Sequence, residues 1–179
     1  MTVRPTLTHT GVYTCDLERM ATFYKDVLGL VETDRGIGIT VPRSLIFLSS
    51  DPAHHHQFVL SDGRPEGVPS TVNQLSFLVK SLEEMREIKR NAHAGGVTRS
   101  NTVNHGNAWS FYFDDPEGNL VEIYAETPWY VPQPFADALD LDKSDAEILE
   151  ETRLRCARDP GVVPVDVWRA RFTEKLGKA

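Results

Sequence analysis

An internal repeat constrains this chain more than any other feature of its sequence. A strand-like segment, a helix N-cap and an apolar helical stripe occur twice, 65 residues apart, in a chain of 179 residues. Asp16 can cap the first helix, because its carboxylate accepts from the free amides of the first turn, and Gly29 ends that helix. Ser81 and Glu84 are typical of a capping box at the start of the second helix. Each copy therefore predicts a β-α-β-β-β unit.

The two units span residues 6–61 and 72–127. Their strands are short and bounded by turn residues, and Asp115–Asn119 is a turn signal between the last two strands of the second unit. One unit alone would leave its sheet half buried, whereas two units can share a core. We therefore expect an α+β fold for residues 1–127. Two paired units would form a curved, cup-like mixed sheet, with helices outside and an open cleft inside.

Residues 128–179 follow a different pattern and form a C-terminal tail. An extended, proline-containing segment comes first. Ser144 and Glu147 predict a capped helix that runs to about Arg158, and Asp166 opens a last helix with an apolar stripe. We expect the tail to pack over the core or on a second subunit, and nothing in it suggests catalysis.

Charge and composition exclude several classes of partner. The formal net charge is −7, from 19 basic and 26 acidic residues, and such a surface repels the phosphates of nucleic acids. No apolar run is long enough to cross a bilayer, and the N-terminus lacks the regions of a signal peptide. Cys15 and Cys156 form no metal or disulfide pattern. We expect a soluble, reduced, cytoplasmic protein with neither nucleic acid nor membrane as a partner.

Three consecutive histidines, His54–His56, are the first candidates for chemistry. Imidazole is the side chain whose charge changes near neutral pH. Alternation on a strand would place His54 and His56 on one face with Phe58 and Leu60, so that one histidine could work in the cleft. The alternative is a solvated polar loop or a chance metal-binding patch.

Glu122 is a lone carboxylate in an apolar strand, and a metal ion would offset the cost of burying it. His9 and Gln74 begin the first strands of the two units, which a pseudo-twofold axis would bring together at the centre of the joined sheet. The three side chains offer nitrogen, amide oxygen and carboxylate oxygen, a set that suits a catalytic divalent metal. The alternatives are an outward-facing Glu122 and a Gln74 that is hydrogen-bonded without any metal role.

His105 and Tyr112 complete the candidate set. His105 lies in a polar loop that contains a glycine, and Tyr112 alternates with Phe111 and Phe113, so its phenol faces away from them. The alternatives are a surface histidine and a core tyrosine with one satisfied hydroxyl.

Two motifs resemble those of the vicinal oxygen chelate superfamily. The opening motif is matched by His9, Asp16-Leu17, Phe23-Tyr24 and Leu28-Gly29, and the closing motif by the segment Ser110–Glu122. The resemblance covers residues 6–127. The superfamily contains glyoxalase I, fosfomycin and bleomycin resistance proteins, and type I extradiol ring-cleaving dioxygenases, and the chain is most similar to the last of these.

The resemblance implies a metal site. The ligands of the dioxygenases are His, His and Glu; His9 and Glu122 match the first and third, while Gln74 stands in place of the second histidine. Fe²⁺ is the implied ion, and Mn²⁺ is the second choice because an amide oxygen favours a harder ion. Glyoxalase I tolerates glutamine as a ligand but takes a second glutamate from its first unit. The segment His56–Leu60 offers no carboxylate there, which argues against that activity.

The resemblance also implies catalytic roles. His56 aligns with the acid/base histidine of the dioxygenases, Tyr112 with their tyrosine ten residues before the glutamate ligand, and His105 with their loop histidine. His56 would handle a proton during ring opening, while Tyr112 and His105 would steady developing negative charge. The substrates would be a small aromatic diol and dioxygen. Related proteins are often dimers. Aromatic residues are enriched at protein interfaces, and the segment Trp129–Tyr130 and the Trp168 helix could supply them, so we expect a homodimer.

A metal-dependent extradiol dioxygenase is therefore the leading hypothesis. The first alternative is an isomerase, epimerase or lyase that polarises a carbonyl through a divalent metal on the same scaffold. The second is a non-catalytic binder of a flat hydrophobic ligand. This alternative stays open because Gln74 stands where the second histidine ligand is expected.

Overall fold

A computed structural model describes residues 3–178 of the chain. The first unit forms a four-stranded sheet with the order β1-β4-β3-β2, in which β1 and β4 are parallel and the other pairs antiparallel. Its elements are β1 (Thr10–Thr14), α1 (Leu17–Leu28), β2 (Val31–Ile37), β3 (Ser44–Ser49) and β4 (Phe58–Asp62).

The second unit repeats this topology. Its sheet has the order β10-β6-β7-β8-β5, with β5 and β8 parallel, and β10 is a short strand added by the tail. The elements of the unit are β5 (Leu75–Leu78), α2 (Leu82–Ala94), β6 (Ser100–Asn104), β7 (Ala108–Asp114) and β8 (Leu120–Glu126). The predicted β-α-β-β-β repeat and the α+β fold class are confirmed.

Local sequence signals set the helix ends. Asp16 caps α1 by accepting from the amide of Arg19, and Gly29 ends the helix with a φ of 67°, which favours glycine. Ser81 caps α2 as expected. The predicted capping box is only half formed, however, because the Glu84 carboxylate accepts from the amide of Lys80 rather than from that of Ser81. The satisfied amide is thus one residue earlier in the chain than the capping box requires.

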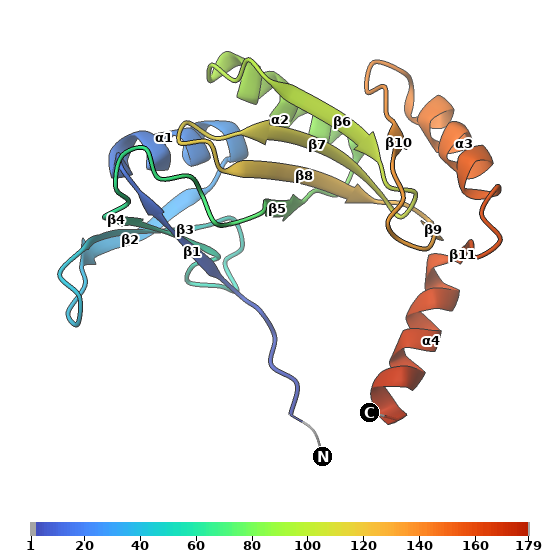
Figure 1. Cartoon of the computed structure of the whole chain (residues 1–179), viewed down its shortest axis with the longest axis horizontal. Helices are drawn as coiled ribbons and strands as arrows, with labels where there is room; N and C mark the ends of the chain where they lie inside the picture. Colours follow the sequence, from blue (N-terminus) through green and yellow to red (C-terminus); the bar gives the residue numbers. More distant parts are fainter. Residues whose placement is uncertain (1–2, 179) are drawn as a thin grey trace.

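The two units share a single apolar core. Helices α1 and α2 pack against each other and lie on the upper side of the sheets, whereas the N-terminal segment and the C-terminal helix extend below (Figure 1). Hydrogen bonding divides the architecture into two sheets instead of one joined sheet. Strands β1 and β5, which carry His9 and Gln74 just before their first residues, are each an outer strand of a different sheet.

Polar contacts at the turn between β7 and β8 connect the units. The Glu117 carboxylate accepts from the amides of Cys15 and Asp16 at the start of α1, with distances of 2.8 Å from its Oε1 to both nitrogens. The Tyr24 hydroxyl of α1 donates to Asp115 Oδ2 at 2.8 Å, and the guanidinium of Arg64 donates to Asn119 Oδ1 at 3.2 Å. The turn that the sequence predicts is therefore the joint between the two halves.

The tail contains two helices with different surroundings. The first helix is α3, which begins with the predicted capping box of Ser144 and Glu147 and buries Ile148, Thr152 and Cys156. The last helix, α4, has no buried residue. The elements of the tail are β9 (Trp129–Tyr130), β10 (Asp137–Ala138), α3 (Asp145–Cys156), β11 (Val163–Pro164) and α4 (Val165–Lys178).

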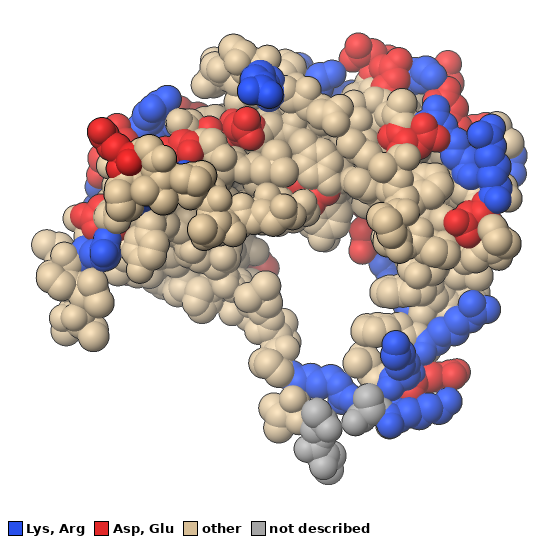
Figure 2. Space-filling view, in the orientation of Figure 1, with Lys and Arg blue, Asp and Glu red and all other residues tan. Residues whose placement is uncertain are grey.

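Helix α4 is attached by a few contacts along one side. Trp168 stacks between Tyr130 and Phe172, with ring centroids 5.2 and 5.4 Å away, and Arg169 pairs with Glu126 at the end of β8. Arg4 donates to the last turn of α4, so the N-terminal segment and the helix surround an opening below the sheets (Figure 2). Within residues 3–178 no helix is long and apolar enough to cross a membrane, and Cys15 and Cys156 are free thiols.

Candidate active site

The register of the second sheet places three polar side chains in one row. Tyr112 on β7 lies opposite Glu122 on β8, and Glu122 lies opposite Ser76 on β5. Directly paired residues share a face of a sheet, and the alternate residues Phe111, Phe113 and Ile123 point into the core. The polar row therefore lies on the face opposite the helices, as the alternation around Tyr112 predicts.

Glu122 is the centre of this row. The residue is 7% exposed, and its Oε2 accepts from Gln74 Nε2 at 2.7 Å and from Ser76 Oγ at 2.6 Å. Its Oε1 accepts from the Tyr112 hydroxyl. The sequence does not predict the part played by Ser76. The available signal is its position two residues after Gln74, which places both side chains at the same face of the sheet.

The donors around Glu122 are all neutral. An amide and two hydroxyls reach the carboxylate, and no lysine, arginine or histidine forms an ion pair with it in the described part of the chain. A buried carboxylate is rarely left without a compensating positive charge. This donor set fits a bound divalent cation, which would supply the missing charge and also accept the oxygen of Gln74 as a ligand.

Tyr112 links Glu122 to the candidate loop histidine. The Tyr112 hydroxyl is 2.9 Å from His105 Nε2, and His105 Nδ1 is 2.8 Å from the carbonyl oxygen of Phe135 in the tail. A carbonyl only accepts, so Nδ1 carries a proton. With Nδ1 as the donor, Nε2 of a neutral imidazole can only accept, and the Tyr112 hydroxyl donates its one proton to Glu122. Hydrogen bonds therefore connect His105 to Glu122 through the Tyr112 hydroxyl.

Burial and the hydrogen bond to Glu122 raise the pKa of Tyr112 to about 12. Loss of water stabilises the neutral phenol, and the carboxylate that accepts its proton acts in the same direction. Tyr112 is therefore a hydrogen-bond donor at neutral pH and not a phenolate.

His9 and His56 form a second group. Their rings meet edge to face with centroids 4.5 Å apart, and the Nδ1 atoms of His55 and His56 are 2.9 Å apart. Burial, followed by the like charges of His9 and His55, lowers the pKa of His56 below its ordinary value of 6.5. The Nε2 atom of His55 also lies 3.4 Å from Oδ2 of Asp34 on β2.

His54–His56 lie in a loop and not on a strand, which is the alternative that the sequence left open. Strand β4 begins at Phe58, and the histidines occupy the connection from β3. The side chain of Gln57 explains this, because its Oε1 accepts from the amide of Ser50 and from the hydroxyls of Ser49 and Ser50. These bonds hold a turn where an extended chain would otherwise begin, so alternation does not decide where His56 points.

The cavity between the units is lined by His9 from the second group and by Gln74 and Ser76 from the first, but not by Glu122, Tyr112, His105 or His56. It has a volume of about 670 Å³, and its walls include Leu30, Phe58 and Phe77. No hydrogen bond joins His9 to Gln74 or Glu122 within residues 3–178, and that range contains no cluster of three or more His, Cys, Asp or Glu side chains suited to a metal. The structure thus connects Gln74, Tyr112, His105 and Glu122, and separately His9 and His56.

Register also identifies the first-unit counterpart of this row. Gly11 on β1 lies opposite Val59 on β4, and Val59 lies opposite Phe47 on β3. These positions correspond to Ser76, Glu122 and Tyr112 in the second unit. The first unit therefore has an apolar row where the second has a polar one. This agrees with the sequence, in which the segment His56–Leu60 contains no carboxylate.

Paired β-α-β-β-β units with one polar row define a class of proteins, and comparisons with known proteins name it. The model of the Glyoxalase/Bleomycin resistance protein/Dioxygenase superfamily matches residues 6–123. The chain belongs to this superfamily, as the two sequence motifs predict.

Two curated relatives come from Rhodococcus globerulus. Biphenyl-2,3-diol 1,2-dioxygenase 3 is 30% identical over 128 residues, and biphenyl-2,3-diol 1,2-dioxygenase 2 is 25% identical over 129 residues. Each alignment covers 69% of this chain and 64% of the relative, so the chain spans just under two thirds of their length.

Solved structures share the fold at lower identity. A glyoxylase/bleomycin resistance protein/dioxygenase domain from Frankia sp. has a TM-score of 0.58 at 20% identity, over 69% of this chain and 99% of the domain. The fosfomycin resistance protein FosX from Listeria monocytogenes, solved with Mn(II) and sulfate, has a TM-score of 0.54 at 21% identity, over 70% of this chain and 95% of FosX. These similarities confirm the mixed α+β architecture.

Proposed function

We propose that the protein is a metal-dependent dioxygenase that cleaves the ring of a small aromatic diol. The observation that carries this proposal is the buried Glu122, which is surrounded by neutral donors and needs a cation to balance its charge. The similarity to two biphenyl-2,3-diol dioxygenases supports an aromatic diol as the substrate.

His9, Gln74 and Glu122 are the proposed ligands, with Fe²⁺ as the ion and Mn²⁺ as the second choice. When bound, such an ion would supply open positions for the two diol oxygens and for dioxygen, which turns a meeting of three reactants into a positioned reaction. The amide oxygen of Gln74 is a weaker donor than an imidazole, so we expect the ion to be held less tightly than by a His-His-Glu set.

The remaining side chains of the site act on protons and charge. Tyr112 stays protonated at neutral pH, so it can donate to a substrate oxygen as negative charge develops there. His105 supports it through the hydrogen bond to its hydroxyl. His56, beside His9, is the proposed acid/base that takes a proton from the diol and returns it during ring opening.

We further propose that the active form is a homodimer with shared sites. Strands β1 and β5 each have an unpaired edge in residues 3–178, and a candidate ligand precedes each of them. An unpaired edge is a template for a further strand. A second copy that placed β1 beside β5 would bring His9 of one chain toward Gln74 and Glu122 of the other.

Reconstitution under anaerobic conditions tests the proposed reaction. Protein purified without a chelator or a histidine tag is loaded with Fe²⁺, given catechol or 2,3-dihydroxybiphenyl, and then exposed to oxygen. We expect a coloured ring-cleavage product and matching oxygen consumption, both lost in Glu122→Gln. Glu126→Gln is the matched control, because Glu126 lies on the same strand but pairs with Arg169. No product from a panel of diols, together with no bound metal by elemental analysis, would refute the proposal.

Gln74 favours one second candidate. An amide in place of an imidazole suits a hard, redox-inert ion, so the same site could polarise a carbonyl in an isomerase, epimerase or lyase. Full activity with Mg²⁺ or Zn²⁺ and no oxygen uptake would select this reaction. The Gln74→His variant separates both enzymes from a non-catalytic binder: increased metal binding and activity would indicate a weakened enzyme, and a loss would give the native amide a role.

A further inference from the structure

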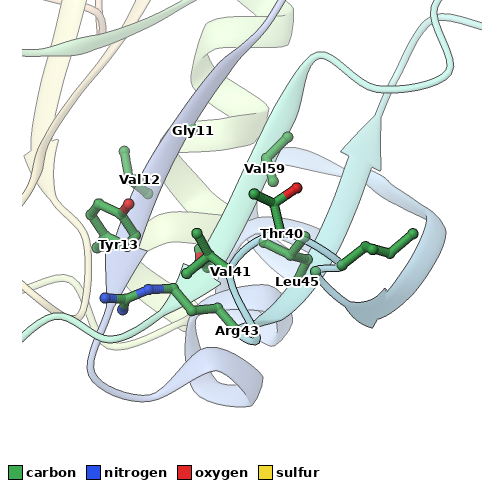
Figure 3. A pocket seen from close by; sticks show the side chains of 11 residues that line it. Gly11, Val12, Tyr13, Thr40, Val41, Arg43, Leu45 and Val59 are labelled. Atoms are coloured by element: carbon green, nitrogen blue, oxygen red, sulfur yellow. The ribbon is translucent and has the colours of Figure 1, made fainter.

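A second pocket lies on the first unit, away from the polar row. It has a volume of about 460 Å³, is open to solvent, and is bordered by β1, β4 and the loop between β2 and β3 (Figure 3). This volume lies within the range of sites that bind small organic molecules. The pocket is lined by Gly11, Val12, Tyr13, Gly38, Ile39, Thr40, Val41, Arg43, Leu45, Val59 and Ser61.

The inner wall of the pocket is largely apolar and is formed by neighbouring strands. Gly11 and Val59 lie side by side on β1 and β4, and Leu45 lies opposite Ser61 on β3. Gly11 has no side chain, so the backbone of β1 itself forms part of this wall. Gly11 and Val59 belong to the apolar row of the first unit, which corresponds to the polar row of the second unit. A flat hydrocarbon ring matches such a wall.

Arg43 is the one cation among the residues that line the pocket. The guanidinium of Arg43 lies 4.9 Å from the centroid of the Tyr13 ring, and its Nη1 donates to the carbonyl oxygen of Asp62 at 2.9 Å. A Cβ atom at Gly63 would be 1.3 Å from Nη1, and Gly63 has a φ of 106°, which favours glycine. The chain thus leaves room for the guanidinium and fixes its position from two sides.

Arg43 has no acidic partner in the described part of the chain. Its neighbours are an aromatic face and a backbone carbonyl, and no ion pair to Asp or Glu is formed within 4.0 Å. A guanidinium has five N–H donors, so most of them remain available to a ligand. In a protein with a net charge of −7, a held and unpaired cation in an apolar pocket is a specific feature for an anion.

We propose that this pocket binds a small aromatic carboxylate. The ring lies against the Gly11–Val59 wall, and the carboxylate pairs with Arg43, whose planar guanidinium can donate two parallel hydrogen bonds. Val41, in the loop between β2 and β3, lines the pocket and is 55% exposed, so it can contact the ring from the solvent side (Figure 3). The proposal concerns binding alone and does not depend on the metal or on the proposed reaction.

Calorimetry with 2-naphthoate as the probe tests the charge requirement in buffer that contains a metal chelator. We expect 2-naphthoate to bind at least about tenfold more tightly than the neutral 2-naphthalenemethanol. Arg43→Gln should remove this difference. The matched control is Arg153→Gln, which removes one positive charge from α3, where Arg153 pairs with Glu150.

A second variant guards against a folding effect of Arg43→Gln. Val41→Asp places a negative charge on an exposed loop residue of the pocket and should abolish binding of 2-naphthoate, with an unchanged unfolding temperature. Amide chemical shifts should change at Gly11 and Val59 on titration. Equal affinity for the acid and the alcohol, or undiminished binding by Arg43→Gln, would overturn the proposal, as would shifts confined to other parts of the chain. Since no metal or turnover is involved, these outcomes are separate from a failure of the dioxygenase assay.

Discussion

At the scale of single residues, the closing motif combines structural and chemical roles. Asp115 accepts from the Tyr24 hydroxyl and from the side-chain amide of Asn119 in the core, while Glu122 at the end of the motif belongs to the polar row. The sequence identifies both parts of the motif together, because the same short segment closes the turn and carries the carboxylate. The sequence places Tyr24 in the helical apolar stripe and in the opening motif, but it does not reveal the partner of its hydroxyl, which lies 91 residues away.

The Tyr24→Phe variant tests the structural part of the motif. Tyr24 is fully buried, so losing its hydroxyl leaves Asp115 with one donor fewer. We expect the free energy of unfolding to fall by about 1–2 kcal/mol, as measured by urea denaturation. Tyr130→Phe is the control, because Tyr130 is half-buried and its ring stacks on Trp168. A loss no larger than that of the control would contradict the role given to this bond.

Tyr24 also predicts a limit at high pH. Burial, followed by the charge of Asp115, raises its pKa well above the ordinary value of 10. The unfolded chain therefore releases this proton near pH 10 while the folded protein keeps it, so stability is complete below pH 10 and falls as the pH rises beyond it. Denaturation curves at pH 8 and pH 11 should show a smaller decrease in Tyr24→Phe than in the unchanged protein. Equal decreases would show that other groups set the limit.

At the scale of helices and strands, the sequence predicts the features that are fixed by hydrogen bonds between near neighbours in the chain. The ends of α1 and α3 follow from Asp16, Gly29 and the Ser144–Glu147 box, which act within one turn of the chain. The start of β4 could not be predicted in this way, because the Gln57 side chain folds back on the preceding turn and displaces the histidines from the strand. The role of Ser76 could not be predicted for a similar reason, since its partner Glu122 is distant in sequence.

Helix α1 receives a cap from outside its own unit, which Glu117→Ala tests. The carboxylate accepts from the amides of Cys15 and Asp16 and pairs with Arg64 at 3.6 Å, and both charged side chains are nearly buried. We expect a loss of about 2–4 kcal/mol in the free energy of unfolding.

Glu117→Gln should restore part of this loss, because it keeps one acceptor oxygen. Glu66→Ala is the control, since Glu66 is exposed on the neighbouring loop. A loss below 0.5 kcal/mol, on the order of an ordinary surface substitution, would show that α1 does not need this cap.

At the scale of the whole molecule, the repeat predicts the units, and the structure supplies their relation. Sequence periodicity cannot show whether two sheets join edge to edge or share only a core, because both arrangements bury the same apolar faces. The chain places α1 against α2 and leaves β1 and β5 as outer strands. The candidate ligands at these strands could therefore be named from the motifs, but their distribution over two groups could not.

The tail provides a test at the same scale. Removing residues 165–179 deletes α4, which buries no side chain, so we expect the unfolding temperature to change by less than about 3 °C. Removing residues 144–179 also deletes α3, whose Thr152 hydroxyl accepts from Trp109 and Asn104 in the core. That truncation should cost about 3 kcal/mol or more, because apolar and polar partners are lost together. Similar thermal melts for both truncations would contradict this division of the tail.

The joint at the turn between β7 and β8 has a consequence for how such a chain can evolve. A gene duplication would at first produce two interchangeable copies, but here Glu117 and Asp115 of the later copy serve a helix of the earlier one. Neither copy can be exchanged or lost without breaking these bonds. The two units are therefore inherited as one piece, although only the later unit carries a carboxylate in its row of paired residues.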